Sequence, residues 1–182
     1  MATREDIKGL IAYLALAFSN FHPDVTSPMN IVDLFMDILG DLPADSLKAA
    51  LRSYCSEDHE FAPMPGQIRS RVVEMLVRAA GVPTSGEAWG VIIGSYERMP
   101  GGNMAGGGHS PILDNPLVVE AVKELGGYTA DLYENQMANR AHFFKIYEVL
   151  YDQVLRDKGQ LPIVRAYIEA NKQDTRLLER GL

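Results

Sequence analysis

Apolar residues recur every three or four positions along most of the chain, and this helical period constrains the fold more than any other feature. The first run extends from Ile7 to Phe21 and covers four turns of one helix face. Later runs keep the same spacing and stop at glycine or proline. No stretch alternates apolar and polar residues for long enough to form a strand. We therefore predict an all-α fold, a small helical bundle of about eight helices in one body or two subdomains.

Residue types that start or stop helices mark the boundaries of these runs. Thr84 and Glu87 have the spacing of a capping box. Asn115 is predicted to cap a helix whose first turn contains Pro116. The pattern predicts helices near residues 7–21 and 31–39, a third helix that begins at Pro43 or Asp45 and includes Tyr54, and a fourth at 65–80. It also predicts a helix from the Thr84 capping box to about Tyr96, further helices at 116–125, 137–158 and 161–168, and a helical turn at 129–134.

One helix start is clamped by prolines, in the segment Phe61-Ala62-Pro63-Met64-Pro65-Gly66-Gln67-Ile68-Arg69. Pro63 and Pro65 keep the residues before them out of the helical region, so residues 61–64 should run extended. Pro65 suits the first helical position, and Gln67 can accept a hydrogen bond from the backbone N–H of Met64. The residues that we interpret as structural in this motif are Phe61, Pro63, Pro65 and Ile68.

Composition divides the chain into three parts. We predict an N-terminal helical domain at 1–82, a C-terminal helical region at 83–170, and a loosely ordered, polar tail at 171–182. Residues 99–115 are rich in glycine, which predicts a long loop. A phosphate-binding loop there would need a Lys-Ser/Thr pair and a preceding apolar strand, and the sequence has neither. Trp89, the only tryptophan, is better explained as a core anchor than as a ligand platform.

The net charge of −7 is unevenly distributed. Residues 1–60 carry four Lys or Arg against ten Asp or Glu, whereas residues 61–80 carry three Arg against one Glu. An acidic first part disfavours nonspecific duplex binding and favours a protein partner with a basic surface. The candidate partner-binding residues are the arginines of the one basic helix: Arg69, Arg71 and Arg78. The alternative is that these arginines form the exposed side of an ordinary amphipathic helix.

The sequence offers no set of residues that predicts catalysis or metal binding. No nucleophile, base and orienting group come together in the pattern. Cys55 and His59 have a spacing that could place them together, but a closed zinc site needs further ligands. The acidic run from Glu57 to Glu60 is better explained as a solvated helix end than as a cation site. We therefore predict no catalytic residues, no metal site and no cofactor, and a protein that is not an enzyme.

Other features of the sequence bear on location. No apolar run reaches the roughly 20 residues of a membrane span. The N-terminal residues lack the apolar core and cleavage site of a signal peptide. The single cysteine excludes an internal disulfide framework and fits a reducing compartment. We expect a cytoplasmic protein without membrane association.

Several segments together carry a family resemblance. They are Thr3–Lys8 before an aromatic-ended helix at Phe18–Phe21, then Leu39–Leu42, Leu47–Leu51 and the Phe61–Arg69 motif. In this order, over about residues 3–80, they resemble the phage replicative-helicase loader/inhibitor, or replisome organiser, proteins. Glu87–Trp89 and Asn115–Gly127 are similar to the second half of many phage and prophage replication proteins.

The resemblance implies a small non-enzymatic accessory factor in phage DNA replication, located in the cytoplasm of the bacterial host cell. Such a factor binds a hexameric replicative helicase of phage or host, helps to deliver it to a phage origin and holds it inactive meanwhile. An origin-binding protein would be a further partner, and nucleic acid a secondary one. The alternatives are a nucleic-acid-binding phage regulator that uses the basic helix, or a structural or other helical phage protein.

Overall fold

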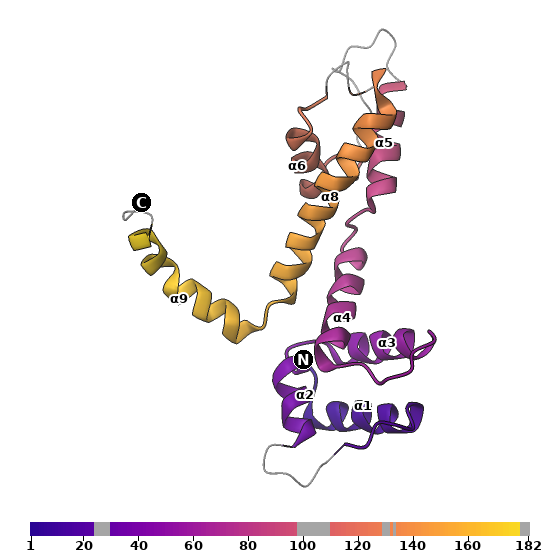
Figure 1. Cartoon of the computed structure of the whole chain (residues 1–182), viewed down its shortest axis with the longest axis vertical. Helices are drawn as coiled ribbons and strands as arrows, with labels where there is room; N and C mark the ends of the chain where they lie inside the picture. The colour runs from indigo at the N-terminus through magenta and orange to yellow at the C-terminus, as the bar shows by residue number, and fades with distance from the viewer. Residues whose placement is uncertain (24–29, 98–109, 129–131, 133, 179–182) are drawn as a thin grey trace. The chain divides into compact units, whose positions relative to one another are not determined.

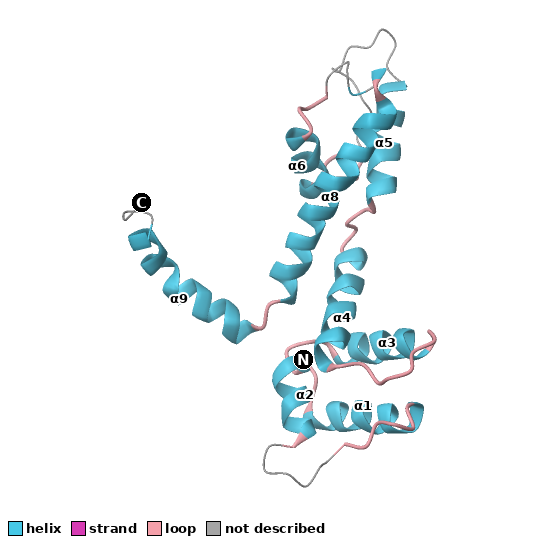
Figure 2. Ribbon diagram, viewed as in Figure 1, coloured by secondary structure: helices cyan, strands magenta, loops and turns pink. Residues whose placement is uncertain are grey.

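The structure is a computed structural model that describes residues 1–23, 30–97, 110–128, 132 and 134–178. These residues contain eight helices and no strand, which confirms the predicted all-α fold (Figures 1 and 2). The helices are α1 (Arg4–Ala17), α2 (Ile31–Leu39), α3 (Ala44–Cys55), α4 (Pro65–Ala79), α5 (Ser85–Glu97), α6 (Pro116–Glu124), α8 (Gln136–Gly159) and α9 (Pro162–Leu178). Most of the predicted glycine-rich loop and of the predicted turn at 129–134 lies outside the described residues. None of the described helices combines the length and apolar character that a membrane span requires.

The chain divides into two compact units. Unit 1 comprises residues 1–76 and 157–182, and unit 2 comprises residues 77–156. Each unit has a hydrophobic core of its own. The predicted domain boundary at residue 82 stays a prediction.

The core of unit 1 is formed by α1, α2, α3 and the first turns of α4, which lie together in Figure 1. Helix α1 begins at a capping box in which the Thr3 hydroxyl accepts from the Asp6 N–H, and the Asp6 carboxylate accepts from the Thr3 N–H. It ends at Ala17, earlier than the predicted end near Phe21. The chain becomes extended at Phe18, whose side chain remains buried in the core. Phe18 thus reaches the core from the residue that follows the helix.

The start of α4 follows the predicted geometry. Met64 donates its backbone N–H to the Gln67 side chain at 2.8 Å, and Pro65 occupies the first helical position. The helix ends before Gly81, which has φ = 81°. This left-handed conformation is the one for which a glycine is favoured at a helix end.

The core of unit 2 is formed by α5, α6 and α8. Helix α5 begins at the predicted capping box, in which Glu87 accepts from the Thr84 N–H at 2.8 Å and the Thr84 hydroxyl accepts from the Glu87 N–H at 3.2 Å. Helix α6 begins at the predicted cap, with Asn115 accepting from the Leu117 N–H. Phe143 of α8 is fully buried in this core.

Helix α9 differs from the prediction for the C-terminal residues. The sequence favoured a short helical pattern at 161–168 followed by a loosely ordered tail from residue 171, whereas α9 continues to Leu178. Its sequence contains no glycine, and its one proline, Pro162, is at the first position, so nothing in it breaks a helix. Residues 179–182 lie outside the described part of the chain.

Candidate partner-binding surface

Arg69 lies inside unit 1, although the sequence placed it among surface arginines. Its side chain is only 6% exposed. The guanidinium forms a two-pronged ion pair with Asp41, at 2.6 and 2.8 Å. It also donates to the backbone carbonyl oxygens of Ile38, Gly159 and Gln160. The expectation of an exposed Arg69 is therefore corrected, because Asp41 and these carbonyls compensate the buried charge.

The Arg69 contacts connect three segments of unit 1 that are far apart in sequence. Ile38 and Asp41 lie at the end of α2, Arg69 lies in α4, and Gly159 and Gln160 join α8 to α9. The ion pair also lowers the pKa of the Asp41 carboxyl, mainly through the hydrogen bonds from Arg69. Arg69 thus links the C-terminal segment of unit 1 to its N-terminal helices.

Arg71 lies at the surface within a small polar and aromatic cluster. Its guanidinium pairs with both carboxylate oxygens of Glu57, at 2.7 and 2.9 Å. It also lies 5.3 Å from the centre of the Tyr54 ring, a cation–π distance. His59 stacks on Tyr54 with ring centroids 3.8 Å apart and lies 3.0 Å from Glu57. The cluster fixes the polar loop that follows α3.

The Glu57–Arg71 pair predicts a specific acid sensitivity. Hydrogen bonds from Arg71, and then from His59, lower the pKa of Glu57 from 4.5 to about 2. A carboxyl with a lowered pKa stabilises the fold fully above its unfolded pKa and loses this effect as the pH falls through its folded pKa. The wild type should therefore lose more stability than Glu57→Gln between pH 4.5 and 2. Urea unfolding midpoints across this range test the prediction, and parallel curves for the two proteins would contradict it.

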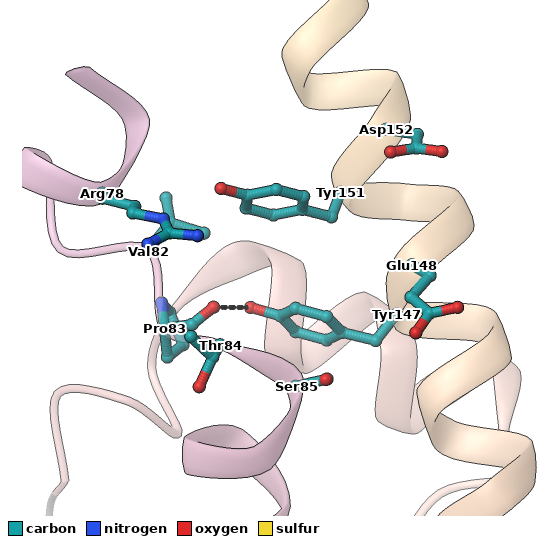
Figure 3. A pocket seen from close by; sticks show the side chains of 9 residues that line it. All are labelled: Arg78, Val82, Pro83, Thr84, Ser85, Tyr147, Glu148, Tyr151 and Asp152. Carbon is teal, nitrogen blue, oxygen red and sulfur yellow. Dashed lines mark hydrogen bonds between the residues drawn. The ribbon is translucent and has the colours of Figure 1, made fainter. Parts of the chain in front are cut away.

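Arg78 lies in unit 2 at the edge of a pocket of about 170 Å³. Figure 3 shows Arg78 and the turn at Val82–Ser85 on one side of this pocket and the α8 side chains on the other. The α8 side chains are Tyr147, Glu148, Tyr151 and Asp152. The Tyr147 hydroxyl donates to the Pro83 carbonyl at 2.5 Å, and burial raises the pKa of Tyr147 to about 12. The pocket is thus lined by two tyrosine side chains, by the positive Arg78 and by the negative Glu148 and Asp152.

The proline-clamped motif points its side chains in two directions. Pro63, Pro65 and Ile68 are buried, and Ile68 belongs to the core of unit 1. Phe61 is 63% exposed and Met64 is 68% exposed. Phe61 is therefore exposed and is not part of the core of unit 1.

The N-terminal part of the chain is similar to one known protein family. Residues 2–69 match the family model of the gene 39 protein, N-terminal domain, which describes phage helicase loader/inhibitor proteins. This match confirms the resemblance to the helicase loader/inhibitor family over those residues. No curated protein and no solved structure matches the chain.

The segment that matches the loader/inhibitor domain ends at Arg69 and includes the whole proline-clamped motif. Asp41, the ion-pair partner of Arg69, also lies within this segment. So do Tyr54, Glu57 and His59 of the cluster around Arg71. Arg71, Arg78 and the pocket of Figure 3 lie beyond it. Trp89 also lies beyond the match, where it is 7% exposed and packs 5.5 Å from Phe143 in the core of unit 2.

Two features of the loader/inhibitor segment were not predicted from the sequence. The ion pair between Asp41 and Arg69 could not be predicted from local spacing, because the two residues are 28 positions apart. The exposure of Met64 had a possible signal, because Met64 lies between two buried prolines and neighbouring side chains of an extended segment point to opposite sides. The same alternation gives no signal for the exposure of Phe61. Within the described residues, no group of three or more histidine, cysteine, aspartate or glutamate side chains could hold a metal ion.

Proposed function

We propose that this chain is a non-enzymatic accessory protein of phage DNA replication that binds a hexameric replicative helicase and loads it or holds it inactive. The observation that carries this proposal is the match of residues 2–69 to the N-terminal domain of the helicase loader/inhibitor family. The helicase would be the main partner, encoded by the phage or by its host, and an origin-binding protein would be a second one.

Charge supports a protein partner over nucleic acid. Residues 1–60 have six more acidic than basic side chains. In α4, Arg69 is paired with Asp41 and Arg71 is paired with Glu57. The charges of these two arginines are thus largely compensated, which weakens their attraction to phosphate groups. We propose Arg71 and Arg78 as contacts at the periphery of the helicase interface.

The helicase itself provides the test of this function. Adding the purified full-length chain to the cognate replicative helicase should lower its DNA-stimulated ATPase activity in a saturable manner if the chain holds the helicase inactive. In the same assay, Arg71→Ala with Arg78→Ala should require a higher concentration for half-maximal effect, because two peripheral contacts are lost. An unchanged ATPase rate at saturating concentrations would contradict the inhibitory part of the proposal.

Nucleic-acid binding through α4 makes a different prediction. If the arginines of α4 contacted phosphates, the affinity for single- or double-stranded DNA would fall steeply as salt rises. We expect only weak binding to oligonucleotides at physiological salt. Tight, strongly salt-dependent binding that Arg71→Ala abolishes would favour the nucleic-acid-binding regulator instead.

A further inference from the structure

The pocket of Figure 3 has the size of a single side chain. It lies within unit 2 and has a volume of about 170 Å³. Sites for cofactors and drug-sized molecules occupy roughly 300–1,000 Å³. The ligand that fits is therefore a group no larger than one side chain. All the residues that line the pocket lie beyond the segment that matches the loader/inhibitor domain.

Two tyrosine rings form one wall of this pocket. Tyr147 and Tyr151 lie one turn apart on α8, with an angle of 16° between their ring planes and 6.4 Å between their ring centroids. The hydrogen bond from the Tyr147 hydroxyl to the Pro83 carbonyl holds the inner ring in place (Figure 3). Tyr151 is only partly buried, so part of its ring is accessible. The face of such a ring attracts cations and flat groups.

Two carboxylates line the pocket beside these rings. Glu148 and Asp152 are exposed and lie four residues apart on α8. Neither carboxylate forms a hydrogen bond or an ion pair with another described residue. Arg156, one turn further along the helix, donates to the Asp152 backbone carbonyl and not to its carboxylate. The negative charge on this side of the pocket is therefore uncompensated.

Arg78, on the opposite side, is the one cation among the described residues that line the pocket (Figure 3). Its charge acts on Glu87, because hydrogen bonds from Thr84 and then the charge of Arg78 lower the pKa of the Glu87 carboxyl. Glu87 thus offsets the charge of Arg78, whereas the two α8 carboxylates have no such partner. The charge around the pocket favours a positively charged ligand over an anion.

We propose that this pocket binds the guanidinium group of an arginine carried by a basic segment of a partner protein. A guanidinium group is flat, so it can stack on the accessible face of Tyr151. Its N–H donors can reach two carboxylates at once, as Glu148 and Asp152 offer, whereas a lysine ammonium is a compact and more strongly hydrated charge. This chemistry identifies the recognised side chain and is independent of the proposed helicase function.

The test is a titration of the ¹⁵N-labelled chain with the capped peptide Gly-Arg-Gly, followed by amide chemical shifts. Saturable shifts should concentrate in the turn at residues 82–85 and in α8 at residues 147–152, with a dissociation constant in the millimolar range. The capped peptide Gly-Lys-Gly should bind at least about threefold more weakly, because its ammonium group cannot stack on the ring and bridge both carboxylates.

Variants of the chain test whether the peptide binds in the pocket. Glu148→Gln with Asp152→Asn should weaken Gly-Arg-Gly binding at least about tenfold, the effect of losing charged hydrogen bonds. Tyr151→Leu, which keeps an apolar side chain, should weaken it about two- to fivefold, whereas Tyr151→Phe should bind like the wild type. The matched control is Glu120→Gln with Glu124→Gln, which removes two carboxylates of the same spacing from α6 and should leave the affinity unchanged. The amide spectrum of each variant without peptide reports whether unit 2 remains folded.

Three results would overturn the proposal. The first is an absence of saturable shifts at these residues in tens of millimolar Gly-Arg-Gly. The second is equal weakening by the α6 control variant, which would mean a general effect of negative charge. The third is binding of capped Gly-Glu-Gly that Arg78→Ala abolishes, which would make the pocket an anion site. The titration contains no helicase, so each of these results would leave the proposed function standing.

Discussion

Arg69→Met lowers the free energy of unfolding of unit 1 by about 3 kcal/mol, the low end of the range for breaking a buried ion pair. Methionine keeps much of the side-chain volume but leaves Asp41 without its partner, and that carboxylate is only 22% exposed. The carbonyls of Ile38, Gly159 and Gln160 lose their donor as well. Urea unfolding followed by far-UV circular dichroism measures the loss.

Two further variants separate the ion pair from general damage. Arg69→Lys keeps the charge but cannot form both bonds to Asp41, so its loss should be intermediate. Combining Arg69→Met with Asp41→Asn should cost less than the sum of the two single changes, because the second change removes the unpaired charge. Strict additivity, or a loss below about 0.5 kcal/mol for Arg69→Met, would contradict the role assigned to this arginine.

Phe143→Ala destabilises unit 2 by about 3 to 5 kcal/mol through the cavity that it leaves. The ring is fully buried and lies 5.5 Å from the ring centres of both Trp89 and Tyr147. The matched control is Phe144→Ala. Phe144 is the next residue in α8 and is only partly buried, so its replacement should destabilise unit 2 less than Phe143→Ala does. Fluorescence of Trp89, the only tryptophan, reports the unfolding of this unit directly.

The same fluorescence signal tests whether the two units unfold separately. Arg69→Met should shift the circular dichroism transition but leave the Trp89 transition in place, because Arg69 belongs to unit 1 and Trp89 to unit 2. Phe143→Ala should shift the Trp89 transition. Coincident transitions by both probes in every variant would indicate one cooperative body instead of two subdomains.

Local signals in the sequence were enough to predict where α4, α5 and α6 begin. The capping box at Thr84 and Glu87, the Asn115 cap and the Gln67–Met64 hydrogen bond all depend on residues within a few positions of each other. Such contacts can be predicted from spacing and residue type alone. The early end of α1 could not be predicted from local spacing, because it depends on where Phe18 packs in the core of unit 1.

The candidate site was harder to predict, since its contacts are long-range. Arg69 and Arg71 are two residues apart on one helix, yet one is buried and the other lies at the surface. Only the fold decides this difference, by bringing Asp41 and the Gly159 carbonyl to Arg69. Several arginines close together in the sequence therefore do not establish that a helix has a basic surface.

Sedimentation velocity of the chain mixed with its cognate hexameric helicase tests whether the two proteins form a complex. We expect that at micromolar concentrations the helicase peak shifts to a higher sedimentation coefficient and that the chain sediments with the helicase. Independent sedimentation of the two proteins at concentrations well above micromolar would contradict the proposed function.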